Sequence, residues 1–293
     1  MDLKKRIKWL LCILLLLGSL GCSMKNEAKS NEKQPKTEQK DLNLAKEAFN
    51  REIKRIKEEK QQLEIELKKA KEYVKKDVRV YDPSTKEDLE KAIQEIEDEK
   101  KIIPKMPDHL ADIQNVTNQV LKEINYEKEI QTIREKKYKL KESIQKYSQI
   151  CAPSSSFVET RVEKNPLVSS AVSIDKKNDP YGNLKKEHQY IGIVFFSSTL
   201  VNQKEVTINE WKATGNIVVD RGIDGGGSIE IFATEKDAKK RNEYLKKFDG
   251  TLLSGGKHKL LGTLVIRTSR LLSDEKQNEL EKSIQKSILE IEK

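Results

Sequence analysis

A heptad-like run of apolar residues constrains the N-terminal half of this chain more than any other sequence feature. Ten positions in alternating steps of four and three hold eight apolar residues and two lysines: Leu42, Lys46, Phe49, Ile53, Ile56, Lys60, Leu63, Leu67, Ala70 and Val74. Charged residues crowd the other faces, and no glycine or proline interrupts residues 41–82. Because this spacing places apolar side chains on one helical stripe, it predicts a long helix of a coiled coil or helical rod.

Prolines and capping residues divide the rest of this half into further helices. Pro83 ends the first helix, Ser84 is expected to cap a second and Asp108 a third. The apolar pattern then shifts phase at Tyr126, which is expected to rewind the supercoil locally without ending it. We expect an antiparallel helical rod over residues 41–150. The same seam can also pair two chains, so a homo-oligomer through the coiled coil is an open alternative.

The charge distribution argues against a nucleic-acid partner. The formal net charge is +9, but residues 41–150 contribute only +1, from 25 basic minus 24 acidic residues. Acidic and basic residues alternate along these helices, which is typical of solvated helix faces. No segment has the concentrated basic surface that nucleic-acid binding needs.

The first 22 residues follow the pattern of a secretory signal. Four basic residues precede an apolar stretch that runs from Trp9 to near Cys22, shorter than the roughly 18–20 residues of a membrane span. Ser19 and Gly21 would suit an ordinary signal peptidase. However, the sequence Gly18-Ser19-Leu20-Gly21-Cys22 resembles the lipobox of bacterial lipoproteins. This resemblance implies removal of residues 1–21, lipidation of Cys22 and a lipid anchor on the extracellular face of the cell membrane.

The cysteines and the segment after Cys22 agree with this interpretation. Cys12 would be removed with the signal and Cys22 lipidated, so Cys151 would be left alone. One cysteine cannot form an intramolecular disulfide, a cysteine metal site or a thiol redox pair. We expect Cys151 to be a small buried or capping residue. Residues 22–40 are almost without apolar side chains, which predicts a disordered tether.

Residues 151–293 have the composition of a separate globular domain. Eleven of the 13 glycines follow residue 150, and strand-like runs alternate with helical patterns. The sequence predicts an α+β sandwich of about four strands, with helices packed on one face. The expected strands are residues 168–174, 190–196, 228–232 and 260–268, with 217–219 as a short strand or edge. A helix from Thr234 would connect the last two as a crossover, right-handed if they are parallel.

Several motifs of this domain carry a second resemblance. They are Asn178-Asp179-Pro180-Tyr181-Gly182-Asn183-Leu184, residues 190–200 (YIGIVFFSSTL), residues 225–232 (GGGSIEIF), residues 241–245 (RNEYL) and residues 265–269 (VIRTS). Together they resemble a C-terminal module of Gram-positive surface proteins and lipoproteins. The resemblance implies a domain boundary near Cys151 and an envelope location, and it implies no activity.

Candidate ligand residues lie in the Asp- and Gly-rich loops of this domain. A loop that binds a glycan or a metal could be lined by Asp179, Asp220, Asp224 and Gly226. Neither the segment around Asp179 nor the segment with Asp220 and Asp224 has the residue spacing of a calcium loop. The glycines at 225–227 precede a strand and not a helix, which favours a tight turn or bulge over a phosphate loop. Arg267 is expected to face outward from its strand.

No catalytic constellation stands out. The three histidines lie in different elements, and no serine or cysteine has the spacing of a nucleophile motif. We therefore expect a cofactor-free, non-catalytic binding or spacer protein whose partner is an envelope protein or glycan. An envelope enzyme or metal-binding module that uses the Asp-rich loops is the alternative.

Overall fold

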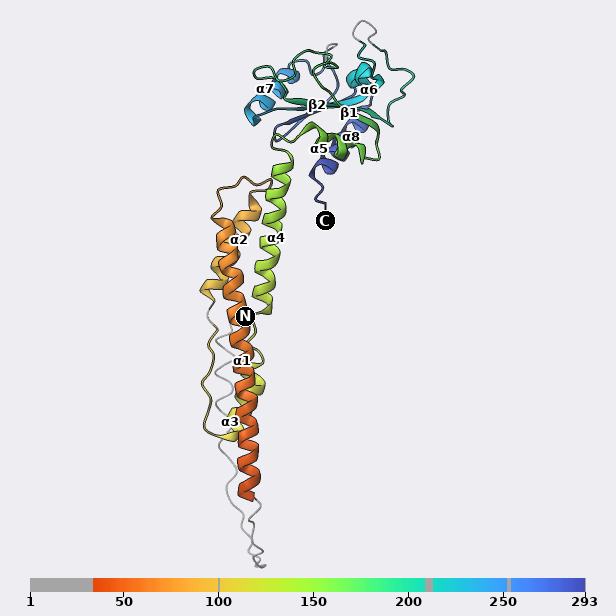
Figure 1. Cartoon of the computed structure of the whole chain (residues 1–293). Coiled ribbons are helices and arrows are strands. Elements are labelled where there is room, and N and C mark those ends of the chain that lie inside the picture. The colour runs from red at the N-terminus through yellow and green to blue at the C-terminus, as the bar shows by residue number, and fades with distance from the viewer. Residues whose placement is uncertain (1–33, 100, 209–212, 252–253, 293) are drawn as a thin grey trace, which may run out of the picture.

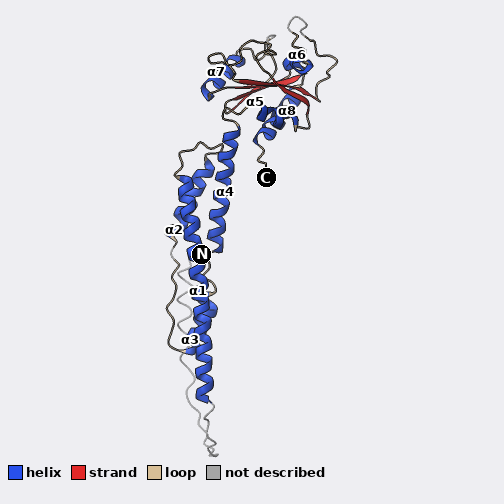
Figure 2. Cartoon of the chain, in the orientation of Figure 1, coloured by secondary structure: helices blue, strands red, loops and turns tan. Residues whose placement is uncertain are grey.

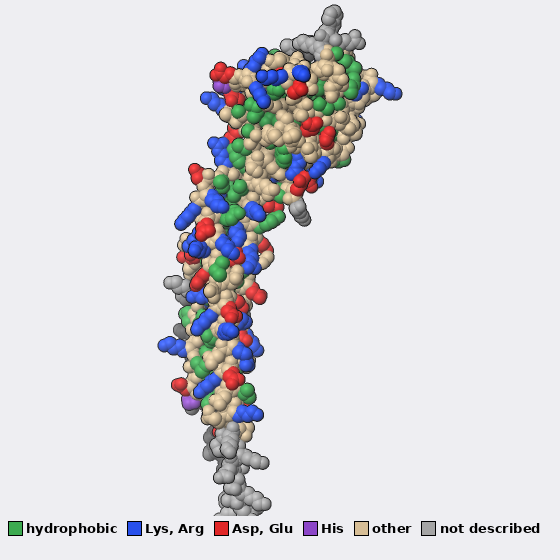
Figure 3. Space-filling model, viewed as in Figure 1, with side chains coloured by type: hydrophobic (Ala, Val, Ile, Leu, Met, Phe, Trp, Pro, Cys, Tyr) green, Lys and Arg blue, Asp and Glu red, His purple; other side chains and the backbone are tan. Residues whose placement is uncertain are grey.

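The computed structural model describes residues 34–99, 101–208, 213–251 and 254–292, with side chains from residue 37. A helical rod (residues 34–150) carries a globular head (residues 151–292) at one end (Figure 1). The chain enters the rod at Gln34, at the end away from the head. Basic and acidic side chains are interspersed along the rod surface (Figure 3). Predicted features before residue 34, including Cys22, lie outside the described residues.

The rod consists of four α-helices and a short π-helical turn packed along one another. They are α1 (Gln34–Val74), α2 (Ser84–Asp98), α3 (Leu110–Asn115), the π-helix η2 (Val116–Leu121) and α4 (Glu127–Gln149). At 1.5 Å per residue, α1 alone is about 60 Å long. Its first seven residues belong to the segment predicted as a disordered tether, so that prediction is wrong for residues 34–40.

The heptad seam of α1 is buried within the same chain. Phe49, Ile56, Leu63 and Ala70, seven residues apart, are all buried. The first three belong to one apolar cluster with Ile113, Leu121, Tyr126 and Ile130 from α3, η2 and the start of α4. Packing of helices from one chain therefore accounts for the seam, and the seven-residue spacing of the buried side chains agrees with the sequence pattern.

The helices run in directions that differ in part from the predicted antiparallel rod. Arg55 donates hydrogen bonds to the carbonyls of Leu121 and Ile124, both at 3.0 Å, and Glu66 pairs with Lys137 at 2.6 Å. Residue numbers thus rise together along α1 and along the segment from η2 to α4, so these two are parallel. The shorter α2 runs antiparallel to α4, since Asp88 meets Lys136 and Lys101 meets Glu129.

Helix boundaries differ from the sequence prediction at several sites. The first helix ends at Val74 and not at Pro83. Ser84 begins α2 without acting as a side-chain cap; its amide and hydroxyl both bond to Asp82. Asp108 is not the cap of α3, which begins at Leu110. Helical structure stops after η2 and restarts at Glu127, so the phase shift ends the helix instead of rewinding it. At this break the backbone amide of Tyr126 donates a hydrogen bond to a Glu59 carboxylate oxygen at 3.0 Å.

The head is built on one five-stranded antiparallel sheet (Figure 2). Its strands lie in the order β1 (Val168–Ser173), β2 (Gly192–Ser198), β3 (Gly226–Ile231), β5 (Leu264–Thr268) and β4 (His258–Leu261). Every residue of β2 and of β3 is buried, because both faces of the sheet are covered. The mixed α and β composition is as predicted, with five strands instead of about four.

Helices cover both faces of this sheet, whereas the sequence predicted one covered face. On one side, α5 (Ser155–Glu163) and α8 (Asp274–Leu289) bury Val158, Leu280 and Ile284 against Phe196. On the other side, α6 (Ile217–Arg221) and α7 (Glu235–Lys246) bury Val218, Ala238 and Leu245 against Phe195. Successive residues of a strand point to opposite faces, which is why Phe195 and Phe196 belong to different cores.

Two predicted strands are also corrected. Residues 217–219 lie in α6, because the Asn216 side chain accepts hydrogen bonds from the amides of Val218 and Val219 and caps a helix. The run 260–268 folds as part of a hairpin, with β4 and β5 turning at residues 262–263. Its second strand, β5, pairs antiparallel with both β3 and β4, so β4, which directly follows α7, runs parallel to β3 with β5 between them. The predicted crossover through α7 therefore joins two parallel strands, β3 and β4.

The rod ends inside the head. Ile150 is buried in the core beneath α5 and α8, and its carbonyl accepts hydrogen bonds from the amide and hydroxyl of Thr263, at 2.9 and 3.1 Å. The Thr263 hydroxyl also accepts from the amide of Ala152. Gly262 has a φ of 59°, and a Cβ there would overlap the Ile150 carbonyl. The β4–β5 turn is therefore shaped to hold the end of the rod.

A second contact joins rod and head through Tyr147, three residues before Ile150. The Tyr147 hydroxyl donates to Glu235 of α7 at 2.5 Å and accepts from Arg79 at 3.1 Å. Arg79 in turn lies 3.4 Å from Glu235. Cys151 beside this contact is exposed, so the expectation of a buried or capping cysteine is wrong.

Candidate functional site

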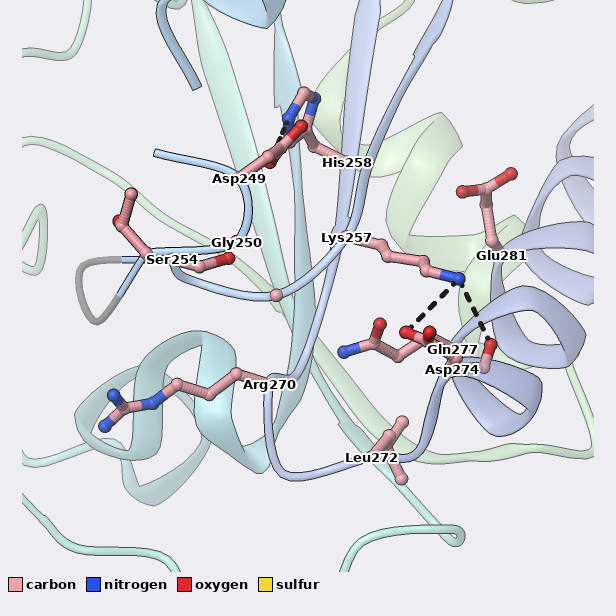
Figure 4. A pocket seen from close by; sticks show the side chains of 12 residues that line it. Asp249, Gly250, Ser254, Lys257, His258, Arg270, Leu272, Asp274, Gln277 and Glu281 are labelled. Carbon is pink, nitrogen blue, oxygen red and sulfur yellow. Dashed lines mark hydrogen bonds and ion pairs between the residues drawn. The ribbon is translucent and has the colours of Figure 1, made fainter. Parts of the chain in front are cut away.

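The head contains a groove of about 680 Å³ between the loop that follows α7 and the first half of α8 (Figure 4). Segments distant in the sequence form it: residues 249–251 and 254–258, the loop that follows β5 and the helix α8. Its lining residues are Asp249, Gly250, Thr251, Ser254, Gly256, Lys257, His258, Arg270, Leu272, Asp274, Gln277 and Glu281. Leu272 is the only large apolar side chain in this described lining.

Hydrogen bonds fix the charged side chains around the groove. Lys257 extends toward α8 (Figure 4). It donates to the carbonyl of Asp274 at 3.3 Å and to the Asn278 side chain at 3.0 Å. His258 lies between two acceptors, with Nδ1 2.8 Å from Asn242 Oδ1 and Nε2 3.1 Å from Asp249 Oδ1. The groove thus presents preorganised groups of both charge signs.

This lining is suited to a polar ligand. Hydroxyl, amide, ammonium and carboxylate groups can hydrogen-bond to sugars, peptides or other polar molecules, whereas apolar contact is limited to Leu272. Most small-molecule pockets are largely apolar, so an apolar ligand would find little to bury here. The groove is therefore a candidate binding site for a polar molecule that carries both donors and acceptors.

Asp179, the first of the predicted loop residues, has a structural role. Its carboxylate accepts hydrogen bonds from the amides of Tyr181 and Leu184 and from the Tyr190 hydroxyl, at 3.0, 2.8 and 2.7 Å. Burial opposes ionisation, but these hydrogen bonds hold the pKa of Asp179 below its usual value. Burial and the adjacent Asp179 raise the pKa of Tyr190. The carboxylate is occupied in organising its own loop.

The other predicted residues lie at the opposite end of the sheet. Asp179 bonds to Tyr190 just before β2, and Asp224 precedes β3, which runs antiparallel to β2. Asp220 accepts hydrogen bonds from the amide and hydroxyl of Thr214, and Asp224 pairs with Arg270 at 3.3 Å. The structure therefore does not bring the three aspartates together. Among the described residues, no group of three or more His, Cys, Asp or Glu side chains could hold a metal ion.

Gly226 lies at the start of β3, where it pairs with Ser197. The predicted tight turn or bulge is therefore wrong at this position. A Cβ on Gly226 would overlap the Ser198 amide and lie 2.6 Å from the Phe196 carbonyl. Its φ of 168° is extended backbone. Close approach of strand β2, and not a left-handed conformation, explains the glycine.

A buried ion cluster on the α7 face of the sheet was missed by the sequence prediction. Glu230 in β3 is fully buried and accepts two hydrogen bonds from Arg241, at 2.7 and 2.8 Å, and one from Arg267 at 3.3 Å. Burial alone would disfavour the charged guanidinium, yet Glu230 raises the pKa of Arg241 above its usual value. Arg267, predicted to face outward, is largely buried in this cluster.

The cluster also adjoins the groove. A Cβ on Gly255 would lie 2.6 Å from Arg267 Nη2, so the loop between Ser254 and Gly256 packs on that guanidinium. Motifs in the segments 225–232, 241–245 and 265–269 contribute Glu230, Arg241 and Arg267. A charged residue inside an otherwise apolar strand was the available signal for this cluster.

Comparisons with models of protein families, with curated proteins and with solved structures find no match for this chain. Within the described residues, no helix is long and apolar enough to cross a membrane.

Proposed function

We propose that this chain is a lipid-anchored protein of the extracellular face of the cell membrane, in which a stiff rod displays a non-catalytic binding head. The lipobox-like sequence ending at Cys22 supports the anchor. The observation that carries the proposal is the placement of Gln34, where the chain enters the rod, at the end farthest from the head (Figure 1). A lipid anchor at Cys22, twelve residues before Gln34, would leave the head directed away from the membrane.

The rod is suited to act as a spacer. Its α1 helix alone measures about 60 Å, and the apolar seam is packed by helices of the same chain. The clamp between Ile150 and Thr263 fixes the last residue of the rod in the head core. A homo-oligomer would need a different face of the rod, because the predicted pairing seam is already buried. We therefore propose that a single chain is sufficient for the spacer role.

The head would bind a polar envelope component through the groove. Lys257, Asp249 and Glu281 offer both charge signs in a cavity large enough for a small polar ligand or a segment of a larger one. An envelope glycan or a polar peptide segment of an envelope protein has the matching hydrogen-bonding groups. No step of bond making or breaking is part of this proposal.

The anchor is tested by a Cys22→Ser variant expressed in a bacterium with lipoprotein processing. We expect the variant to leave the membrane fraction or to accumulate as the unprocessed precursor, because the acylated thiol is missing. Cys151→Ser is the matched control and should stay with the membrane. A Cys22→Ser protein that remains in the membrane fraction with the mass of the unaltered protein contradicts the proposed anchor.

The groove is tested by thermal melts of the full chain with a panel of soluble wall fragments and envelope peptides. A ligand that binds the native state raises the melting temperature in a saturable manner. Combined substitution of Lys257→Gln and Glu281→Gln should abolish that rise, whereas Lys54→Gln and Glu58→Gln on the exposed rod surface should not. A ligand response that the groove variant retains would place binding elsewhere on the chain.

A further inference from the structure

Polar atoms without partners gather at the start of β3, under helix α6. Among the described residues, six buried side-chain nitrogen or oxygen atoms have no hydrogen-bond partner, and four of them belong to Ser197, Gln203, Arg221 and Ser228. Buried polar groups in folded proteins are nearly always hydrogen-bonded, so such a concentration at one place requires an explanation.

The two serines are neighbours on the sheet. In the β2–β3 ladder Ser197 pairs with Gly226, and Ser228 pairs with Phe195, which makes Ser197 and Ser228 diagonal neighbours on one face. This is the face that α6 covers, since Phe195 packs in the same core as Val218. Both serines are more than nine-tenths buried.

Arg221 and Gln203 border the same place. A Cβ on Gly225 would lie 3.6 Å from Arg221 Cδ and 3.7 Å from Gln203 Oε1, so both side chains reach the residue that precedes Gly226. Gln203 is held there by a hydrogen bond from its Nε2 to the Gly225 carbonyl at 2.7 Å. The Nε atom of Arg221, which has no hydrogen-bond partner, is covalently attached to this Cδ atom and therefore lies close to Gly225 as well.

The two aspartates near Arg221 in the sequence do not pair with it. The adjacent Asp220 is occupied by Thr214, and Asp224 pairs with Arg270. In the described part of the chain no carboxylate pairs with Arg221. A guanidinium can only donate hydrogen bonds, and a buried donor without an acceptor costs about 1–3 kcal/mol.

We propose that Arg221, together with Ser197 and Ser228, binds a small oxyanion, a carboxylate or phosphate group. The guanidinium supplies a charged donor at Nε and the serine hydroxyls supply additional donors, which match the acceptor oxygens of such an anion. This site is separate from the groove and does not depend on the membrane anchor.

The test uses thermal melts of the full chain in sodium phosphate, sodium acetate and sodium chloride at equal ionic strength and pH 7. We expect phosphate or acetate to raise the melting temperature in a saturable manner relative to chloride, and the more effective ion distinguishes the phosphate from the carboxylate. Arg221→Gln should raise the anion concentration for half-maximal effect at least about tenfold, the loss expected for a charged hydrogen bond. Arg51→Gln, on the exposed surface of α1, is the matched control and should respond as the unaltered chain does.

Ser228→Ala provides a second measurement if Arg221→Gln fails to fold. Removal of a buried hydroxyl without a partner should leave the anion-free melting temperature unchanged or higher, while the response to the anion weakens. Three results would each overturn the proposal: equal melting in all three salts, equal anion responses of Arg221→Gln and Arg51→Gln, or an undiminished response of Ser228→Ala.

Discussion

At the scale of single residues, the most consequential feature of the head is a carboxylate buried in the middle of a central strand. Glu230 has two arginine partners and no solvent exposure. Taking these charges out of water is costly, and the cost is offset only while each member keeps its hydrogen bonds. The cluster also ties β3 and β5 to α7, because Arg267 and Arg241 come from those elements.

Glu230→Gln is therefore expected to lower the free energy of unfolding by about 3–5 kcal/mol, as is usual when one partner of a buried ion pair is removed. The amide keeps the shape of the side chain but leaves Arg241 and Arg267 without a counter-charge. Urea denaturation of the full chain measures the effect. Glu243→Gln, on the exposed surface of α7, is the control and should change stability by less than about 0.5 kcal/mol. Similar stabilities of the two variants would mean that the cluster contributes little.

Residue patterns also show why some local structure could be predicted and some could not. Ser154, Thr234 and Ser273 cap α5, α7 and α8 with their side chains, and serine and threonine are common at this position of a helix. Residues 217–219 are β-branched and favour a strand, but the Asn216 side chain caps them as the start of helix α6. Strand propensity alone does not predict this cap. Arg267 in an apolar strand could be read as outward-facing because its partner, Glu230, is 37 residues away.

At the scale of elements, the heptad seam predicted the long helix, but the directions of the helices depended on contacts between distant residues. Arg55 bonds to backbone carbonyls 66 and 69 residues later. Glu66, only 5% exposed, is surrounded by Lys69, Arg134 and Lys137. The hydrogen bond from Lys137, partly opposed by burial, holds the pKa of Glu66 below its usual value. We infer that this buried polar contact helps to fix the register between α1 and α4.

The seam itself can be tested with two matched double variants of α1. Ile56→Asp with Leu63→Asp places carboxylates at buried positions and should lower the free energy of unfolding by at least about 3 kcal/mol. Leu44→Asp with Ile65→Asp makes the same chemical change at positions 53% and 41% exposed and should cost less than about 1 kcal/mol. Circular dichroism at 222 nm during urea unfolding follows the rod. Equal losses in the two double variants would show that α1 does not pack through the assigned stripe.

The groove and the order of the strands could not be predicted from single elements, because both depend on contacts between residues that are distant in the sequence. The groove combines the loop after α7 with the first half of α8, and its two sides are brought together only by the order of the strands in the sheet. The sequence from residue 260 to 266 contains no charged residue, so it was predicted as part of one strand. The turn of the β4–β5 hairpin lies at Gly262 and Thr263 within this run. Covering of both sheet faces follows from α6 and α7, and α6 was itself predicted as a strand.

At the scale of the whole molecule, the junction between rod and head decides how rigidly these two parts are coupled. The last rod residue, Ile150, is a core residue of the head, and Tyr147 contacts both Arg79 of the rod and Glu235 of the head. Both contacts link the end of the rod to the head and oppose bending at the junction. A head coupled to the rod in this way would keep its groove at a fixed distance from Gln34, the first described residue of the rod.

The same junction moves the boundary of an independently folding head to a point before Ile150. The sequence placed that boundary at residue 151, but Ile150 is 4% exposed and its carbonyl accepts two hydrogen bonds from Thr263. A fragment of residues 148–293 should therefore exceed a fragment of residues 151–293 in free energy of unfolding by about 2–4 kcal/mol, the usual cost of losing a buried aliphatic side chain. Within the longer fragment, Ile150→Ala should reproduce most of the loss and Ser148→Ala, at an exposed position, should not. Urea denaturation of the four proteins measures the differences. If both fragments unfold at the same urea concentration, Ile150 belongs energetically to the rod, and the head is a separate domain joined to it only at the surface.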